Sequence, residues 1–250
     1  MKLLTFNCQK DYTSRVLGFI VETLRSGTYD FILFQELTSN VYEKIIPGIS
    51  NYKFLRAMNM STGSWSDLAI AYRDTFELAD SKFFDFTIVA KEQISRPSYG
   101  LLIGAFKSSR GMQSVGTLHM NPGLNPGLRK KEGRFVKKCL LDYMQVSGSP
   151  LVFGGDFNSG LPWENKRNER IFLPEFVNCA SSSGPTCDSR YVEPTNFLNK
   201  LARALAVIGI HFRMKVDHFY VDRATLKQSS ITCAVLPNIV SDHRPLEIVM

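Results

Sequence analysis

LVFGGDFN, residues 151–158, is the stretch of this 250-residue chain that says most about its fold. The run Leu151–Phe153 is continuously apolar, which is typical of a strand buried on both faces. Two glycines then bring the chain to a polar end at Asp156 and Asn158. A buried strand delivers its terminal side chains to the rim of a sheet with little freedom, and rims of this kind build functional sites.

The same arrangement recurs along the chain. One polar residue at a strand end carries no weight, because chains often turn polar where they leave the core. Here carboxylate, carboxamide and imidazole groups stand at or just past strand ends eight times, which predicts a shared site: Asn7, Glu36, His119, Asp156, Asn158, Asp217, Asp242 and His243.

The chemistry of these groups fits one task. Carboxylate oxygens are hard ligands that suit Mg²⁺ or Mn²⁺, and widely spaced acids without a thiolate cluster argue against structural zinc. A histidine beside an aspartate can bind phosphate as imidazolium or shuttle a proton. Together they suit attack of water on a phosphate ester, where charge must be neutralised and the nucleophile aligned.

Hydrophobic periodicity predicts more strands than helices. The predicted helices are Ser14–Arg25, Val41–Ile46, Lys130–Gln145 and Phe197–Val207. Between residues 161 and 211, prolines divide the chain into loops and short helices. The predicted strands are Lys2–Phe6, Phe31–Phe34, Tyr52–Ala57, Leu68–Tyr72, Phe83–Val89, Tyr99–Phe106, Gln113–Leu118, Leu151–Phe153, Lys215–Val221, Ile231–Leu236 and Leu246–Val249. This order favours an α+β sandwich, and the lack of a linker favours a single domain over residues 1–250.

Composition excludes several other classes. With 44% hydrophobic and 21% charged residues, the chain is neither disordered, collagen-like nor a coiled coil. No apolar run approaches the roughly 18 residues of a membrane span. Five scattered cysteines fit reduced thiols, and the apolar start is too short for a signal peptide, so we expect a cytoplasmic location. We also expect a monomer. The net charge of +7 tilts the expected partners toward anions.

Five blocks resemble, in order, the signature blocks of the endonuclease/exonuclease/phosphatase superfamily, the deoxyribonuclease I-like family. They are Thr5-Phe6-Asn7, Phe34-Gln35-Glu36, Gly154-Gly155-Asp156-Phe157-Asn158, Val216-Asp217-His218 and Ser241-Asp242-His243-Arg244-Pro245. Thr117-Leu118-His119 resembles a further block loosely. The blocks span residues 5–245. The resemblance implies a four-layer α/β/β/α sandwich of two packed mixed β-sheets, with the site at one edge of the sheets.

The resemblance also implies a role for each residue. Glu36 would hold the essential divalent metal, Mg²⁺ or Mn²⁺, with Asn7 and Asp242 close by. Asp156 would orient or deprotonate the attacking water, and Asn158 would support the water and the transition state.

The remaining roles concern the phosphate. His243, held by Asp217, would contact the scissile phosphate. His119 would bind the phosphate or protonate the leaving oxygen, and Arg96 would bind phosphate. By contrast, His211 and His218 are interpreted as structural, and Trp65 and Trp163 as packing residues rather than base-stacking platforms.

The substrate is less defined than the catalyst. The first hypothesis is a metal-dependent phosphodiesterase that acts as a nuclease on DNA or RNA, with endonuclease and exonuclease modes both open. The alternative is a phosphoesterase for a lipid head group, of sphingomyelin or phosphoinositide type, or another small phosphate ester. A third hypothesis, an inactive binding protein, is disfavoured by the complete set of acids and imidazoles.

Two further features bear on the branch of the family. The blocks are similar to those of tyrosyl-DNA phosphodiesterases, but Phe6 stands where that group has Trp. The Trp-containing first block of abasic-site endonucleases of the exonuclease III type is also missing. On the predicted helix after His119, one face carries Lys130, Arg134, Lys137 and Lys138. This face is either a nucleic-acid patch or the solvated side of an outer helix.

Overall fold

The computed structural model describes residues 1–9, 13–59, 64–86, 89, 99–122, 126–188, 204–205, 207, 212–227, 230–237 and 241–250. Two six-stranded sheets form its centre. The first has the strand order β13-β14-β1-β2-β4-β3, in which β1 and β2 are parallel and the other neighbours antiparallel. Its strands are β1 (Lys2–Asn7), β2 (Phe31–Gln35), β3 (Tyr52–Asn59), β4 (Ser64–Arg73), β13 (Thr232–Val235) and β14 (Leu246–Val249).

The second sheet has the order β5-β6-β7-β8-β12-β9, in which only the β7–β8 pair is parallel. A separate ladder joins β10 (Cys187–Asp188) to β11 (Arg213–Met214). The strands of the second sheet are β5 (Glu77–Asp85), β6 (Gly100–Ser108), β7 (Gly111–His119), β8 (Leu151–Asp156), β9 (Phe176–Asn178) and β12 (Asp217–Asp222).

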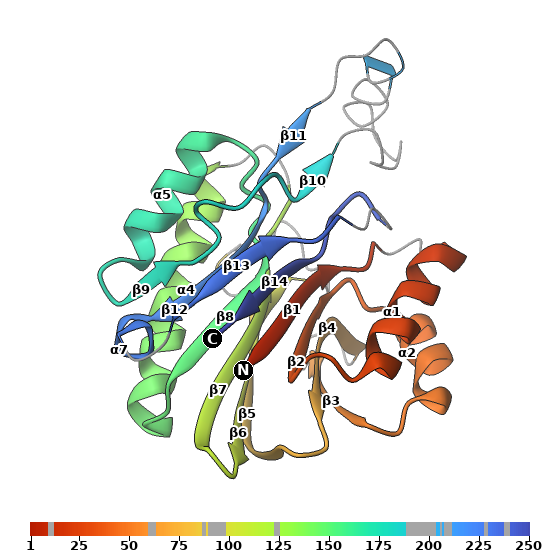
Figure 1. Cartoon of the computed structure of the whole chain (residues 1–250). Coiled ribbons are helices and arrows are strands. Elements are labelled where there is room, and N and C mark those ends of the chain that lie inside the picture. The colour runs from red at the N-terminus through yellow and green to blue at the C-terminus, as the bar shows by residue number, and fades with distance from the viewer. Residues whose placement is uncertain are drawn as a thin grey trace.

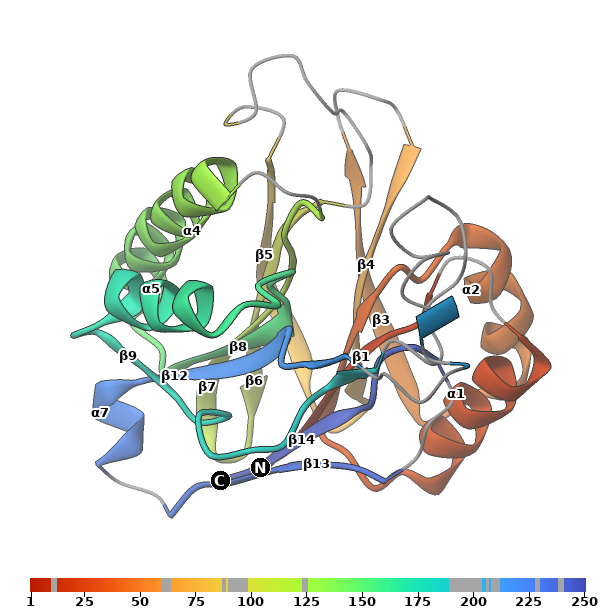
Figure 2. The same ribbon diagram turned by 90° about the horizontal axis from the view of Figure 1, so that it is seen from above.

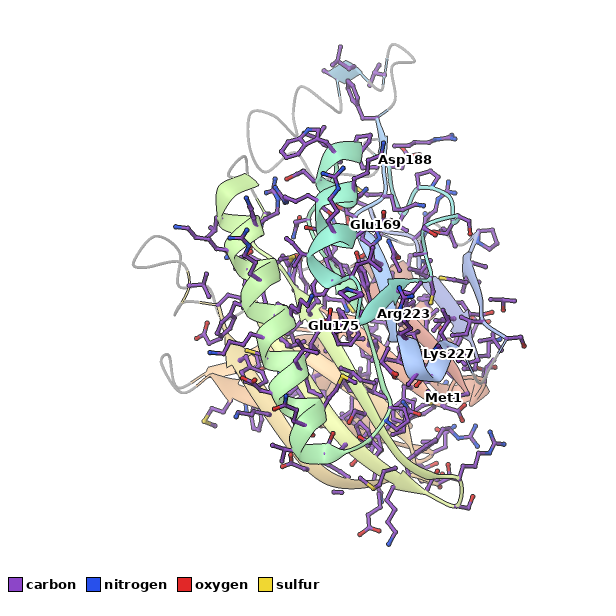
Figure 3. The ribbon with its side chains drawn as sticks, turned by 90° about the vertical axis from the view of Figure 1, so that its left-hand side faces the viewer. Met1, Glu169, Glu175, Asp188, Arg223 and Lys227 are labelled. Atoms are coloured by element: carbon purple, nitrogen blue, oxygen red, sulfur yellow. The ribbon has the colours of Figure 1, made fainter. Side chains whose placement is uncertain are left out.

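Helices cover the outer face of each sheet (Figures 1 and 2). The first sheet is covered by α1 (Ser14–Ser26) and α2 (Ser39–Ile45), which is followed by the short 3₁₀ helix η1 (Ile46–Gly48). The second is covered by α4 (Pro126–Ser147) and α5 (Pro162–Phe172), which lie side by side in Figure 3; α7 (Arg223–Leu226) is a single turn. The predicted four-layer α/β/β/α sandwich is therefore confirmed. Among the described helices, none has the length and apolar character needed to cross a membrane.

Three apolar cores hold the four layers together. The middle core lies between the sheets and includes Phe31, Leu33, Val115, Val152 and Phe219. The two outer cores lie between each sheet and its helices. A central strand is thus buried on both faces, which explains why β2 and β8 read as continuous apolar runs.

The structure differs from the sequence-based prediction in several elements. The largest omission is α5, because Pro162 is taken as a break although it stands in the first turn, where its fixed φ favours a helix. α4 begins at Pro126 rather than Lys130, and β5 covers Glu77–Asp85 rather than Phe83–Val89. The predicted helix Phe197–Val207 lies mostly outside the described residues, as does Arg96.

Predictions about individual side chains can also be compared with the structure. Trp65 and Trp163, interpreted as packing residues, are both about half-exposed, so each packs with only part of its side chain. His218 is buried, and its ring lies between Asn165 and Asn178 with hydrogen bonds of 3.1 Å, as expected of a structural histidine. All five cysteines are free thiols, as predicted.

Candidate active site

Sheet topology brings the predicted residues to one edge of the sandwich. β1 and β2 are parallel, so Asn7 and the residue after Gln35 reach the same edge. β7 and β8 are parallel, so His119 lies opposite Asp156. β12 runs antiparallel to β8, which sets Asp217, its first residue, on the other side of Asp156.

Asp156 is the centre of this arrangement and is almost fully buried. Its Oδ2 accepts a hydrogen bond of 3.0 Å from Asn7 Nδ2. The same oxygen lies 3.5 Å from His119 Nε2 and 3.7 Å from His243 Nε2. Its Oδ1 accepts the backbone N–H of Asn158 at 2.7 Å. Each carboxylate oxygen therefore has a defined direction.

Asp217 and His243 form the closest charged pair of the site, with 2.9 Å between Oδ2 and Nδ1. The start of β12 is fixed because Thr186 Oγ1 accepts the backbone N–H of Asp217 at 3.0 Å. The backbone N–H of His243 donates to Ser241 Oγ at 3.0 Å. Neither the strand end nor the imidazole ring is free to turn away.

Glu36 and Asp242 lie at the more open side of the site. Glu36 has a positive φ of 59°, an uncommon backbone conformation for a glutamate, and its Oε1 lies 3.7 Å from His119 Nε2. The pKa of Asp242 is raised to about 6, chiefly by burial; the charge of His243 opposes this increase, and the charges of Glu36, Asp156 and Asp217 contribute to it. Two carboxylates that repel each other in this way are suited to a hard divalent cation.

Asn158 occupies a left-handed position with a φ of 48°. Its Nδ2 donates to the carbonyl of Met120 at 2.7 Å, which ties the loop after β8 to the loop after β7. The amide of Asn7 is used on both sides, because its Oδ1 accepts the N–H of Gln9 at 2.9 Å. A carbonyl oxygen has a second lone pair, so this atom can still face a cation.

Charges inside the site depend on each other. Burial raises the pKa of Asp156, whereas His243 and His119 lower it and Asp217 raises it. Burial lowers the pKa of His243, but the acids Asp217, Asp242 and Asp156 together raise it well above its ordinary value. These acids therefore favour the imidazolium form of His243, and the carboxylate of Asp217 fixes its orientation.

This protonation bears on where a metal can bind. Asp156, Asp217 and His243 bring one potential ligand atom each within 4.8 Å of one another. However, an imidazolium has no lone pair to offer, and Nδ1 of His243 is already bonded to Asp217. Glu36 and Asp242 are oxygen donors without that restriction, so the donor set fits a divalent cation at the open side.

Some residues of the site have no signal in the sequence blocks. Thr186 and the buried pair of Asn121 and Glu132 are examples: Glu132 Oε2 accepts the N–H of Asn121 at 3.3 Å, and its Oε1 accepts the side-chain N–H. Gln35 belongs to one of the sequence blocks, and its Nε2 joins the two sheets by donating to Thr117 Oγ1 at 2.8 Å. A buried amide in an apolar strand is the signal that could have identified it.

Comparisons with known proteins agree with this architecture. No protein-family model and no curated protein matches the sequence. Among solved structures, D. rerio TDP2 complexed with single strand DNA product has a TM-score of 0.76 and 15% identity, over 100% of this chain and 99% of that one. A Bacteroides thetaiotaomicron mannosyl-6-phosphatase has a TM-score of 0.72 and 16% identity, over 100% and 98%.

A third structure, an endonuclease/exonuclease/phosphatase family protein from the same bacterium, has a TM-score of 0.71 and 15% identity, over 99% and 93%. At these identities the similarity establishes the fold. The resemblance drawn from the sequence blocks is thus confirmed at the level of the deoxyribonuclease I-like fold, and the chemistry is argued from the site.

Proposed function

We propose that this protein is a divalent-metal-dependent phosphodiesterase of the endonuclease/exonuclease/phosphatase superfamily, and that it acts as a nuclease. The observation that carries the proposal is the set of side chains around Asp156. A buried carboxylate accepts a hydrogen bond from Asn7, and the Nε2 atoms of two imidazoles lie within 3.7 Å of the same oxygen. This set can orient a water and bind a phosphoryl group at one point.

Each residue has a chemical task in this proposal. Asp156 orients the attacking water and accepts its proton, and burial favours this because a raised pKa makes the carboxylate a better base. His243 binds a phosphoryl oxygen as imidazolium, with Asp217 stabilising its charge. His119 binds the phosphate or donates a proton to the leaving oxygen. Asn158 holds the loop that carries these groups in register with Met120.

Glu36 and Asp242, together with the Oδ1 of Asn7, are the proposed ligands of Mg²⁺ or Mn²⁺. When bound, such a cation neutralises the charge that develops on the phosphate. The supporting argument is the donor set itself: Glu36 is close enough to Asp242 that its charge, after burial, is among the causes that raise the pKa of Asp242.

Nucleic acid is the proposed substrate class. The net charge of +7 favours a polyanionic substrate. The chain also has the fold of a TDP2 structure that is complexed with single strand DNA product. A small phosphate ester is the alternative, because a mannosyl-6-phosphatase has the same fold. Of the four basic residues on the face of α4, Lys137 donates to the carbonyl of Leu173 and pairs with Glu175. This supports the reading of the face as a solvated outer surface.

A substrate panel tests the proposal. Purified protein is incubated with Mg²⁺, and separately with EDTA, against supercoiled plasmid, single-stranded DNA, RNA, 5′-phosphotyrosyl DNA, sphingomyelin, an inositol polyphosphate and bis-p-nitrophenyl phosphate. We expect metal-dependent cleavage of a nucleic acid. Asp156→Ala should lower the rate by at least about 100-fold, the typical contribution of a positioned acid or base. Asp142→Asn, an exposed acid on α4, is the matched control and should keep the wild-type rate.

The outcomes separate the hypotheses. Turnover of only the lipid, the inositol phosphate or the small ester would select the alternative. Equal rates with and without EDTA, or a normal rate in Asp156→Ala, would contradict the proposed mechanism.

A further inference from the structure

The chain has two tryptophans, and both are unusually exposed. Trp65 is 46% exposed and Trp163 is 51% exposed. Tryptophan is large and apolar and is highly buried on average in folded proteins, so two such residues at the surface need an explanation. Each ring also has an arginine over it: Arg56 lies 5.2 Å from the centre of Trp65, and Arg167 lies 5.5 Å from that of Trp163.

Trp65 lies at the catalytic edge on the side of the first sheet. β4 runs antiparallel to β2, so β4 begins where β2 ends. The N–H of Leu37, the residue after Glu36, donates to the carbonyl of Asp67 at 2.9 Å. Trp65 is two residues before Asp67 on β4. Trp65 therefore lies on the part of β4 that precedes the contact with Leu37, at the end of the sheet where Glu36 lies.

The arginine beside Trp65 is itself held in place. Arg56 donates to Ser39 Oγ at 3.2 Å, and its guanidinium carbon lies 4.3 Å from the centre of the Tyr42 ring. Both partners belong to α2, the helix that follows Glu36 in the chain. Trp65 thus packs against an arginine whose position is fixed by two side chains of α2.

Trp163 lies at the same edge on the side of the second sheet. It is the second residue of α5 and follows Asn158 by five positions. The start of α5 is tied to the site, because Ser159 Oγ donates to Asn165 Oδ1 at 2.7 Å and Asn165 Nδ2 donates to the carbonyl of Lys215 at 3.1 Å. Seen from above, α5 lies on the outer side of the second sheet, whereas β4 belongs to the first sheet (Figure 2).

We propose that Trp65 and Trp163 are two base-stacking contacts on either side of the catalytic edge, which bind unpaired bases of a single-stranded nucleic acid. The inference rests on the proposed nuclease function and names the form of substrate the site takes. Flat aromatic rings stack on any base, and the neighbouring guanidinium groups of Arg56 and Arg167 attract the phosphates between bases. Arg167 also lies 3.6 Å from Glu164, but this acid pairs with Arg129 as well, so the group of three keeps a net positive charge. A strand that crosses the site would meet one ring before the scissile phosphate and the other after it.

Tryptophan fluorescence tests this directly, since the protein has no other tryptophan. The full-length protein is titrated in EDTA with an oligo-dT strand and with an abasic strand of equal length and charge. We expect oligo-dT to quench the fluorescence and the abasic strand to leave it nearly unchanged. Trp65→Phe and Trp163→Phe each retain a single tryptophan, and both variants should still be quenched by oligo-dT.

Affinity is measured in parallel with a labelled oligo-dT strand. Trp65→Ala and Trp163→Ala should each weaken binding at least about 5-fold, the lower end of what one stacked base contributes. Met112→Ala removes an exposed apolar side chain at the opposite end of β7 from His119 and should bind like the wild type.

Equal quenching by both strands, or unchanged affinity in both alanine variants, would overturn the stacking surface. A single-tryptophan variant that is not quenched would overturn the assignment of the ring it retains. The titration needs no turnover, so its outcome is independent of the substrate panel. If the protein cleaves DNA but binds both strands equally, only the stacking proposal is refuted. If quenching depends on the bases but no nucleic acid is cleaved, the nuclease function is contradicted and the stacking surface is still supported.

Discussion

Gly155 shows how a single residue sets the direction of the central carboxylate. Its φ is 145°, which favours glycine, and a Cβ at this position would lie 2.0 Å from the carbonyl oxygen of Leu118. β7 and β8 approach each other here because no side chain intervenes, and the next residue is Asp156.

Gly155→Ala is therefore expected to lower the free energy of unfolding by about 3 kcal/mol or more, through backbone strain and the forced separation of two strands. Urea denaturation measures the loss. Gly18→Ala is the matched control: Gly18 lies inside α1 with nothing near its added Cβ, and alanine there should stabilise the protein by up to about 1 kcal/mol. Similar behaviour of the two variants would contradict the close approach of β7 and β8 at Gly155.

The pair of Asp217 and His243 is a second place where single residues determine a property of the candidate site, here the protonation of an imidazole. The carboxylate raises the pKa of the imidazole, so Asp217→Asn should lower that pKa and leave less imidazolium at neutral pH. We expect kcat to fall about 100-fold and the alkaline limb of the pH profile to move to lower pH. NMR titration of His243 in the metal-free protein measures the pKa, with Asp142→Asn as control. An unchanged pKa would remove Asp217 from its proposed role.

A helix or strand could be predicted from the sequence where one kind of residue in a local run determines the structure. The runs of β2 and β8 identify buried strands because both faces of each strand meet a core. The site followed from the same signal, since polar residues at the ends of such strands have only the sheet edge to occupy. α5 was missed because proline has opposite meanings inside a helix and in its first turn.

Positioning residues escaped the sequence for a different reason. Thr186 and Glu132 act by accepting N–H groups from other segments, which lie 30 or 31 residues away for Thr186 and 11 residues away for Glu132. Which threonine or glutamate does this depends on tertiary packing alone, and no local pattern reports it. Exposure of Trp65 and Trp163 was missed likewise, because hydrophobicity predicts burial on average but not at a site edge.

Glu132 links helix α4 to the catalytic loop. It is fully buried, and the residue it holds, Asn121, follows His119 by two positions. Burial raises the pKa of Glu132 to about 7 from an ordinary value of 4.5, although the hydrogen bonds from Asn121 and the charge of Arg129 lower it. The folded state therefore retains a proton that the unfolded chain releases, and the protein loses stability as pH rises from about 4.5 through about 7.

Glu132→Gln is neutral at every pH and should lack this loss. The free energy of unfolding of the variant relative to the wild type should rise by up to about 3 kcal/mol between pH 5 and pH 8, in urea denaturation series at each pH. Only the pH dependence of the difference is informative, because the substitution also changes the hydrogen bonds to Asn121. A difference that stays constant with pH would show that Glu132 is ionised throughout.

At the scale of the molecule, the candidate site joins the two sheets. Asn7, Glu36, Asp242 and His243 belong to the first sheet and its connections, whereas His119, Asp156 and Asp217 belong to the second. Two of the hydrogen bonds described above cross between them, from Asn7 to Asp156 and between His243 and Asp217. Neither sheet could assemble the site alone, so the packing of the sandwich and its chemistry are coupled.

This coupling predicts that metal binding stabilises the whole fold. A cation held by Glu36 and Asp242 would bind the folded chain and reduce the repulsion among acids from both sheets. Mg²⁺ at 100 times its Kd should raise the free energy of unfolding by about 2.7 kcal/mol relative to EDTA. Because Asp242 must lose its proton, with a pKa of about 6, the gain should grow as pH rises through 6. Glu36→Gln and Asp242→Asn should abolish it, and Glu77→Gln, an exposed acid on β5, should retain it. Equal stabilisation of all three variants in urea denaturation would mean that the cation binds elsewhere.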